Sequence, residues 1–193
     1  MHPNQFSMKR FFLYSSIFIF ISLFSCSEDV LPKPKAQLRL QYPESSYQSL
    51  SSDCPYTFEY SQLAKIQVNQ KCWTNIYYPA LKASINITYR PIENNLQELF
   101  SESEKLTFNH TIKADGISSL PFENKEHNTY GSLFEVTGNA ASPLQFHLTD
   151  SIKHFMTGAV YFDVTPNYDS IQPAISYIEK DLQKIMESAI WKN

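Results

Sequence analysis

The sequence has few glycines, little net charge and no repeated or biased segments. Only four of its 193 residues are glycine, and no internal repeat or low-complexity tract occurs, which argues against a disordered or repetitive chain. The formal net charge of −3 is too small to indicate a nucleic-acid partner or a polybasic membrane patch. Because 42% of the residues are hydrophobic and 15% are aromatic, the composition favours one globular domain with a substantial core.

The short motifs that mark many enzyme families are also absent. The sequence contains no GxGxxG, Walker, GxSxG or HExxH pattern. Such patterns bind nucleotides, position a nucleophilic serine or hold zinc. We therefore expect no catalytic residue, no metal site and no cofactor, and we expect that the protein is not an enzyme.

The longest apolar run lies near the N-terminus. Lys9 and Arg10 precede the uncharged run FFLYSSIFIFISLFS, which ends at the small residue Ser25. A helix that crosses a bilayer needs roughly 20 apolar residues, so the run is too short to favour a permanent span. A basic start, a short apolar segment and a small residue at its end predict a secretory signal peptide over residues 1–25.

The four residues LFSC that end at Cys26 are typical of a bacterial lipobox. An aliphatic residue stands at position −3, a small residue at −1 and cysteine at +1, although Phe24 at −2 is bulkier than usual. The alternative is a signal peptide with a chance cysteine at its end. We expect Cys26 to carry the lipid of a membrane-anchored protein, because several acyl chains give stable anchoring.

The remaining two cysteines are expected to pair. Three cysteines are awkward in an exported protein, but lipidation of Cys26 would leave only Cys54 and Cys72. An oxidising envelope compartment favours their disulfide over two free thiols in a core. In the chain-entropy model, closing a loop of this length stabilises a domain by about 3 kcal/mol.

After the signal peptide, the pattern predicts an extended tether over residues 26–52 and a globular domain over residues 53–193. The proline-spaced LPKPK favours polyproline II structure. The alternation at Leu38 and Leu40 leaves two alternatives open, an edge strand laid on the domain or a disordered segment.

Within the domain, apolar periodicity predicts strands and two helices. Alternating residues indicate strands at 64–69, 72–79, 83–89, 130–138, 142–150 and 153–164. We expect the second and third runs to form a hairpin, with Pro79 in its connection. Helical spacing indicates helices at 92–108 and 171–189, with Asp169 as the N-cap of the second. Strands grouped in blocks favour an α+β fold with an antiparallel sheet. The element order resembles the Mog1/PsbP arrangement.

The densest group of polar residues is the stretch FHLTDSIKH, which holds His147, Asp150, Ser151 and His154. Neighbours in sequence rarely form a catalytic triad, and the two histidines lack further ligands at a zinc-site spacing. We therefore predict a solvated turn between two strands, with His147 on the polar face of its strand.

Other polar residues are expected at the surface. These are His110, His127, Glu98, Glu102 and Glu104. Two Asp-Ser-Ile sequences make Ser151 and Ser170 candidates for O-glycosylation.

The chain is rich in tyrosine, and two interpretations stay open for the tyrosines of the domain. The residues concerned are Tyr77, Tyr78, Tyr89, Tyr130, Tyr161 and Tyr168. We favour packing within the sheet, because aromatic residues fit pleated, half-buried positions. The alternative is an exposed surface that binds a glycan or a protein.

Several long stretches carry a resemblance to a known family. They are CSEDVLPKPKAQLRLQYPE, CPYTFEY, CWTNIYYPALKASINITYRPIENNL, TIKADGI, GNAASPLQFHLTDSIKHFMTGAVYF and PNYDSIQPAISYIEKDLQ. Together they span nearly all of the chain after residue 25, and they resemble the gliding motility lipoprotein GldD family.

The resemblance implies an envelope protein with a lipid anchor, for example palmitate. It further implies that the protein is required for gliding and is associated with the machinery that also serves type IX secretion. No catalytic residue is carried over. The expected partners are the membrane, through the anchor, and other envelope proteins of that machinery, without nucleic acid. We expect the domain to face the periplasm. The alternative is a lipoprotein that binds or modifies an envelope ligand such as peptidoglycan, another glycan or a lipid.

Overall fold

The computed structural model describes residues 42–108, 114–163 and 168–192. All of them belong to the unit formed by residues 35–193. The signal peptide, Cys26, and Leu38 with Leu40 lie outside the described residues.

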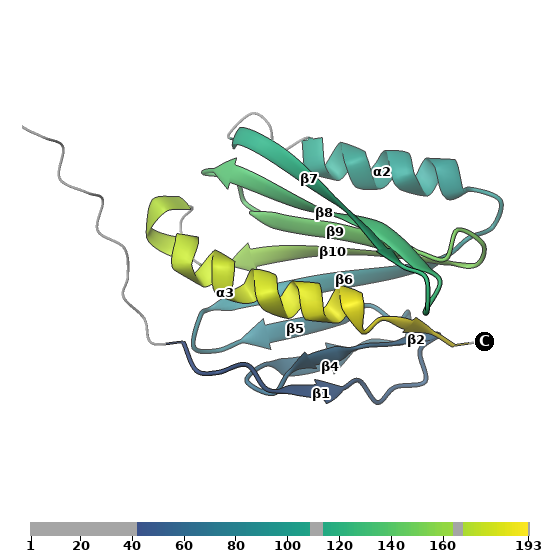
Figure 1. Cartoon of the computed structure of the whole chain (residues 1–193), viewed down its shortest axis with the longest axis horizontal. Helices are drawn as coiled ribbons and strands as arrows, with labels where there is room; N and C mark the ends of the chain where they lie inside the picture. The colour runs from purple at the N-terminus through teal and green to yellow at the C-terminus, as the bar shows by residue number, and fades with distance from the viewer. Residues whose placement is uncertain (1–41, 109–113, 164–167, 193) are drawn as a thin grey trace, which may run out of the picture. The chain divides into compact units, whose positions relative to one another are not determined.

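Within the described residues, seven strands form one antiparallel sheet in the order β4-β5-β6-β10-β9-β8-β7 (Figure 1). Their bounds in chain order are β4 Lys65–Val68, β5 Thr74–Tyr78, β6 Ala83–Pro91, β7 Ala114–Asn124, β8 Thr129–Gly138, β9 Leu144–Thr149 and β10 His154–Phe162. Each strand pairs with its sequence neighbour except at the centre, where β6 pairs with β10 along nine residues. Two local meanders are therefore joined by a single long-range pairing.

Short strands bring the beginning and the end of the domain together. The strand β1 Tyr47–Ser49 pairs with β3 Glu59–Ser61. The strand β2 Tyr56–Thr57 pairs with β11 Ile190–Trp191, which comes shortly after the last helix. These pairings incorporate residues 47–49, which the sequence assigned to the tether, into the folded domain.

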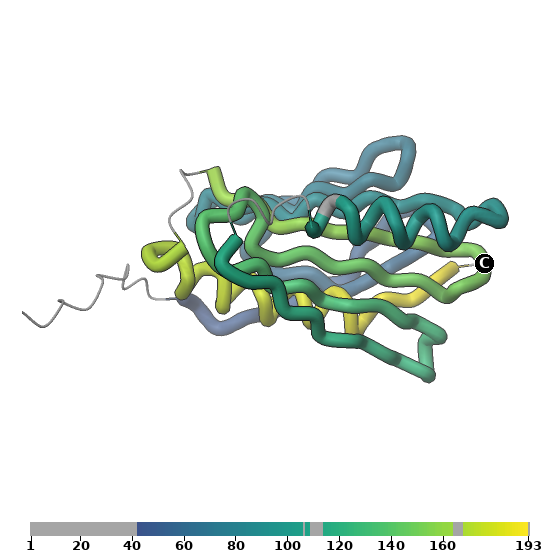
Figure 2. The backbone as a smooth tube through the Cα atoms, turned by 90° about the horizontal axis from the view of Figure 1, so that it is seen from above, coloured from purple at the N-terminus to yellow at the C-terminus, as the bar shows by residue number. Residues whose placement is uncertain are grey.

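The helices of the described residues, α2 Leu96–Phe108 and α3 Tyr168–Glu187, cover opposite faces of the large sheet (Figure 2). The buried stripe of α3 includes Ile175, Ile178 and Leu182, which recur at helical spacing. Pro173 is the sixth residue of α3 and lies beyond its first turn, so it removes one intrahelical hydrogen-bond donor from the helix. The helix begins at Tyr168, so Asp169 lies in its first turn and not at the predicted N-cap. In the first turn its negative charge still interacts favourably with the helix dipole.

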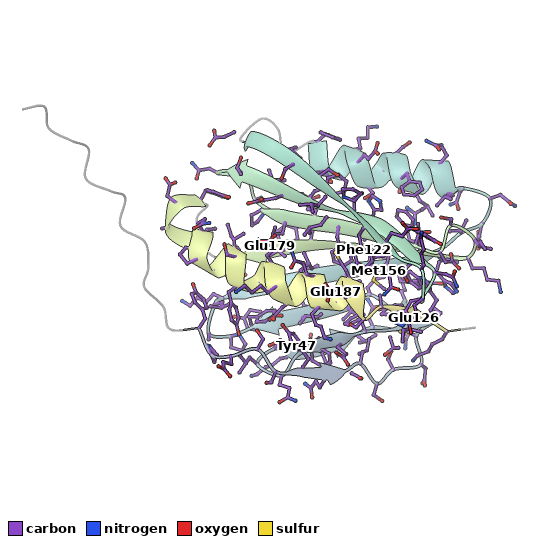
Figure 3. All side chains as sticks on the ribbon, in the orientation of Figure 1. Tyr47, Phe122, Glu126, Met156, Glu179 and Glu187 are labelled. Atoms are coloured by element: carbon purple, nitrogen blue, oxygen red, sulfur yellow. A yellow bond between two sulfur atoms is a disulfide. The ribbon has the colours of Figure 1, made fainter. Side chains whose placement is uncertain are left out.

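The larger core lies between α3 and the sheet. It contains Ile76, Ile85, Ile87, Phe146, Leu148, Met156 and Val160 from the strands. Figure 3 labels Met156 on the sheet behind α3. A smaller cluster lies under α2, where Phe100 makes an edge contact with Phe155 and Leu99 is buried. Because both helices cover the middle strands, all six residues of β9 are buried.

The predicted fold class is confirmed, since the chain is an α+β domain built on an antiparallel sheet. The six predicted strands correspond to β4, β5, β6, β8, β9 and β10, and both predicted helices are present. The hairpin of β5 and β6 has Pro79 in its connection, as expected. The short strands and β7 were not predicted. The Mog1/PsbP resemblance stays a prediction.

Cys54 and Cys72 form a disulfide, with their Cα atoms 5.5 Å apart. It links the segment before β2 to the turn between β4 and β5. The turn is further held by Tyr56, whose hydroxyl donates to the carbonyl oxygen of Cys72 at 2.7 Å and lies 2.7 Å from Oγ1 of Thr74. The N-terminal part of the domain is thereby fastened to the sheet by a covalent bond and by a buried tyrosine.

Candidate functional site

The fold separates the polar residues of the stretch FHLTDSIKH. His147 in β9 pairs with Thr157 of β10, and side chains alternate along a strand, so His147 and His154 lie on opposite faces of the sheet. The prediction that both histidines belong to a solvated turn is wrong, because each is 7% exposed. The sequence does not reveal that α2 covers the face of β9 on which His147 lies.

His147 occupies an aromatic environment under α2. Its ring lies 5.2 Å from that of Phe100, 5.7 Å from that of Phe134 and 6.1 Å from that of Phe155, centroid to centroid. Among the described residues, its Nδ1 has no hydrogen-bond partner. Burial lowers the pKa of His147 to about 4, so the imidazole is neutral at pH 7. The residue therefore fills space in the small core.

His154 lies on the other face, near the C-terminus of the chain. Its ring stacks on Trp191 of β11 at a centroid distance of 5.2 Å, and its Nδ1 lies 2.9 Å from the hydroxyl of Tyr89. Burial lowers the pKa of His154. These contacts fix β11 against the end of β10.

Asp150 organises the turn between β9 and β10. Its Oδ1 accepts hydrogen bonds from the backbone N–H groups of Ile152, Lys153 and His154 at 2.8–2.9 Å. Burial alone raises the pKa of Asp150, but the backbone hydrogen bonds from His154, Ile152 and Lys153 lower it by more, so the carboxylate stays ionised. The exposed residue Ser151 has a positive φ of 64° in this turn. For these two residues the predicted turn is correct.

The remaining residues singled out from the sequence do not converge. Glu98, Glu102 and Glu104 are exposed on α2, as expected, and Glu102 pairs with Arg90 of β6. His127 lies in the turn between β7 and β8, where its Nδ1 is 3.3 Å from Nδ2 of Asn124. Ser170 lies in the first turn of α3. His110 lies outside the described residues.

The tyrosines divide between the two interpretations. Tyr78 is buried, and Tyr77, Tyr89 and Tyr168 are half-buried, which agrees with packing. Tyr130 and Tyr161 are exposed on the face of the sheet that carries α2.

A buried carboxylate that sequence reasoning missed joins three parts of the domain. Asp181 of α3 is fully buried, and it accepts hydrogen bonds from Ser45 at 3.3 Å, from Tyr47 at 2.9 Å and from Tyr78 at 3.0 Å. Burial, and secondly the Asp181 charge, raise the pKa of Tyr78. The Tyr78 hydroxyl therefore keeps its proton and donates it in the hydrogen bond to Asp181. The sequence did contain an indication, since Asp181 falls within the apolar stripe of α3.

The hydrogen bonds to Asp181 and two further contacts with α3 fix the segment that leads into the domain. Tyr42 stacks on Tyr177 of α3 at a centroid distance of 4.8 Å, and the Tyr177 hydroxyl donates to the carbonyl oxygen of Pro43 at 3.2 Å. Residues 42–49 are therefore held against α3, although the sequence placed them in the extended tether.

The strand β7 forms one edge of the large sheet, since it pairs only with β8 among the described residues. Leu120 of β7 is 62% exposed. Beside it lies a groove of about 290 Å³ lined by Leu120, Pro121, Phe122, Leu133, Gln183, Met186 and Glu187; Figure 3 labels Phe122 and Glu187. We call β7 and this groove the β7 surface.

A second surface lies on the face of the sheet that carries α2. Two hollows of about 550 Å³ and 260 Å³ share Asn86 and Thr88 of β6. The first is lined by Gln67, Val68, Asn69, Trp73, Thr74, Asn75, Asn86, Ile87 and Thr88. The second is lined by Asn86, Thr88, Ser103, Gln145, Phe146, Thr157, Gly158, Ala159 and Tyr161. We call the two hollows together the polar groove.

The described residues contain no group of three or more His, Cys, Asp or Glu side chains arranged to hold a metal ion. Neither α2 nor α3, the helices of the described part of the chain, is long and apolar enough to cross a membrane.

Comparison with known proteins identifies one family. The model described as gliding motility lipoprotein GldD matches residues 27–191, a range that includes every strand and helix described above. A comparison with curated proteins found no match.

Proposed function

Since the chain belongs to the gliding motility lipoprotein GldD family, we propose that it acts as a non-enzymatic scaffold of the gliding and type IX secretion machinery. Membership implies a membrane-anchored envelope protein that takes part in gliding. In this proposal the lipid is attached to Cys26, the domain faces the periplasm, and another envelope protein binds to the domain.

The observation that carries the proposal is the β7 surface. An edge strand presents unpaired backbone N–H and C=O groups, to which a strand of another protein can add. Pro121 has no backbone N–H, so this edge has no donor at that position. Leu120 and the adjoining groove provide apolar contact area beside that edge, as the centre of a protein interface requires.

The contacts of Asp181 support a scaffold for a second reason. They hold residues 42–49 against α3, so the part of the chain that leads toward Cys26 has a fixed direction where it meets the domain. A domain held in this way presents the β7 surface in a defined orientation relative to residue 42.

The experiment compares two exposed aliphatic residues. Leu120→Glu places a charge in the β7 surface, whereas Ile152→Glu places one in the turn between β9 and β10, where Ile152 is 73% exposed. We expect cells that carry Leu120→Glu to lose gliding and cells that carry Ile152→Glu to glide normally, with equal amounts of both proteins in the membrane.

Crosslinking identifies the partner directly. A photoactivatable residue at position 120 should capture one envelope protein in intact cells, and the same residue at position 152 should not. Normal gliding of the Leu120→Glu strain, or the same captured proteins from both positions, would contradict the proposal. Cleavage of the domain by protease added to whole cells would contradict its periplasmic location.

A further inference from the structure

The polar groove has an unusual composition for a surface of this size. Among the described residues that line its two hollows, none is Asp, Glu, Lys or Arg, while amide and hydroxyl side chains are frequent. A site for a phosphate, a carboxylate or a metal ion normally provides charged side chains or oriented backbone dipoles. The composition therefore favours a ligand that is polar and neutral.

Asn75 and Asn86 provide paired donors and acceptors on the floor of the groove. They are cross-strand partners on β5 and β6, and one amide donates to the other. Each amide has both a donor and an acceptor end, so one carbonyl oxygen and one NH₂ group stay without a partner among the described residues. A donor beside an acceptor matches two neighbouring hydroxyl groups of a ligand.

Gln145 extends this pattern beneath α2. The side chain is 6% exposed, and one end of its amide lies 3.0 Å from Oγ1 of Thr107. The Thr107 hydroxyl also lies 3.2 Å from the carbonyl oxygen of Ser103, to which it can donate. Thr107 can therefore bind either the oxygen or the nitrogen of the Gln145 amide. In both orientations the other end of the amide has no partner among the described residues. A buried amide without a partner is costly, and Gln145 lines the second hollow, although its unpartnered end is itself closed to solvent.

Aromatic side chains lie in both hollows. Trp73 lines the first hollow and is 44% exposed, and the exposed Tyr161 lines the second. Exposed aromatic faces pack against the C–H faces of sugar rings, because both surfaces are apolar and flat. The Lys71 ammonium lies 5.3 Å from the centre of the Trp73 ring. A ligand that stacks on Trp73 would therefore lie close to this charged group.

We propose that the polar groove binds a neutral oligosaccharide segment, with the amides of Asn75 and Asn86 bound to its hydroxyl groups and with Trp73 and Tyr161 packed on its rings. The first hollow is within the usual size of a small-ligand site. This inference goes beyond the proposed scaffold role, and it concerns a different face of the domain from the β7 surface.

A peptide is a less suitable occupant of the groove. Peptides that bind sheets usually add to an edge, where backbone groups are unpaired. Most of the floor of the groove is instead the face of β5, β6 and β10, whose backbone groups pair with one another; the edge strand β4 contributes Gln67 and Val68 to the first hollow. Over that floor side chains must supply the hydrogen bonds, which suits a ligand whose own polar groups are hydroxyls.

The test uses the full-length lipidated protein in a detergent without a sugar headgroup. Calorimetry measures binding of four neutral probes, cellohexaose, maltohexaose, mannohexaose and chitohexaose, together with an acidic probe, a galacturonate hexamer, and an uncharged Ser/Gly hexapeptide. We expect saturable binding of at least one neutral oligosaccharide and of neither other probe. Because the proposed ligand carries no charge, the Kd for a neutral oligosaccharide should change less than about twofold between about 0.05 and 0.5 M salt.

Variants separate the groove from the rest of the domain. Asn86→Ala and Trp73→Ala each replace an exposed side chain and should raise Kd about tenfold, the usual cost of one lost polar or stacking contact. Tyr130→Ala is the matched control, since Tyr130 is an exposed aromatic residue on the same face but outside the groove, and it should leave Kd unchanged.

Failure of every neutral probe to bind would overturn the inference. Preferential binding of the hexapeptide or the galacturonate, or an unchanged Kd in Asn86→Ala and Trp73→Ala, would overturn it equally. The gliding phenotype of Leu120→Glu is measured separately, so the two proposals fail independently.

Discussion

The hydroxyl of Tyr78 in β5 lies 3.0 Å from Oδ2 of Asp181 in α3, and both side chains are buried. The hydrogen bond joins the sheet to the helix through the core. The Asp181 carboxylate also accepts from Tyr47, so three separate segments depend on one acceptor.

Removal of this donor should destabilise the domain. Because hydrogen bonds to a buried charge contribute about 1.5–3 kcal/mol, we expect Tyr78→Phe to lower the free energy of unfolding by that amount in urea titration. Tyr161→Phe is the matched control, since Tyr161 is exposed, and its effect should stay within about 0.5 kcal/mol. Equal effects of the two substitutions would show that the Tyr78–Asp181 hydrogen bond contributes no net stability.

The disulfide provides a second test of stability. With a sequence separation of 18 between Cys54 and Cys72, the chain-entropy model gives a stabilisation of about 3 kcal/mol. The double variant Cys54→Ala, Cys72→Ala should lose about that much in urea titration, and reduced wild-type protein should match it. If oxidised wild-type protein and the double variant unfold at the same urea concentration, the bond does not stabilise the domain.

The buried imidazole of His147 predicts sensitivity to acid. Its pKa of about 4 in the folded protein lies below the ordinary value of 6.5, so the unfolded chain takes up this proton first as the pH falls. The contribution of the neutral His147 side chain to the free energy of unfolding is fully present above pH 6.5. It is lost as the pH falls from 6.5 to 4, by up to about 3 kcal/mol.

Urea titrations at several pH values check this prediction. Between pH 6.5 and 4, the free energy of unfolding of His147→Phe should fall less than that of the wild-type protein. His154, whose pKa is also lowered, keeps its own contribution in that variant. An identical pH profile for wild type and His147→Phe would show that the imidazole does not contribute.

Close packing at Gly158 predicts a further large effect. A Cβ atom at this position of β10 would overlap the ring of Phe146 in the neighbouring strand. Phe146 is itself buried and cannot move freely, so Gly158→Ala should cost roughly 1–3 kcal/mol in thermal or urea unfolding. At the exposed Gly116, a Cβ atom would lie 3.3 Å from Thr137 Oγ1, so Gly116→Ala is the control, and its cost should be smaller. The reverse order would contradict the packing seen here.

The two candidate glycosylation sites differ in their surroundings. Ser151 is exposed in a turn, whereas Ser170 is half-buried in the first turn of α3. If the Asp-Ser-Ile sequences are modified, mass spectrometry of the native protein should find a glycan on Ser151 in preference to Ser170. Absence of a glycan mass at both serines would end the hypothesis.

Local patterns were sufficient to predict most of the large sheet. The strand β6 alternates the buried residues Ile85 and Ile87 with polar neighbours, because one of its faces packs under α3. The same periodicity located α3. Helical and strand periods are properties of a few adjacent residues, so they can be recognised before the tertiary structure is known.

The unpredicted features depend on which elements meet in space. The strand β7 is an exposed edge with few buried side chains, so it lacks an apolar pattern and even contains Pro121. The environment of His147 depends on α2, which packs on a face that sequence alone indicates as polar. Likewise, the three donors of Asp181 come from positions 45, 47 and 78, and no local spacing relates them to the helix.

The attachment of residues 42–49 to α3 has a mechanical consequence. A pulling force that enters the domain at residue 42 reaches the Tyr42–Tyr177 stack and the Asp181 hydrogen bonds before it reaches the large sheet. Several side chains must then separate together, whereas a flexible leader would simply straighten. In a membrane-anchored lipoprotein of gliding motility, such a junction would transmit tension that reaches residue 42 directly into the longest helix of the described domain.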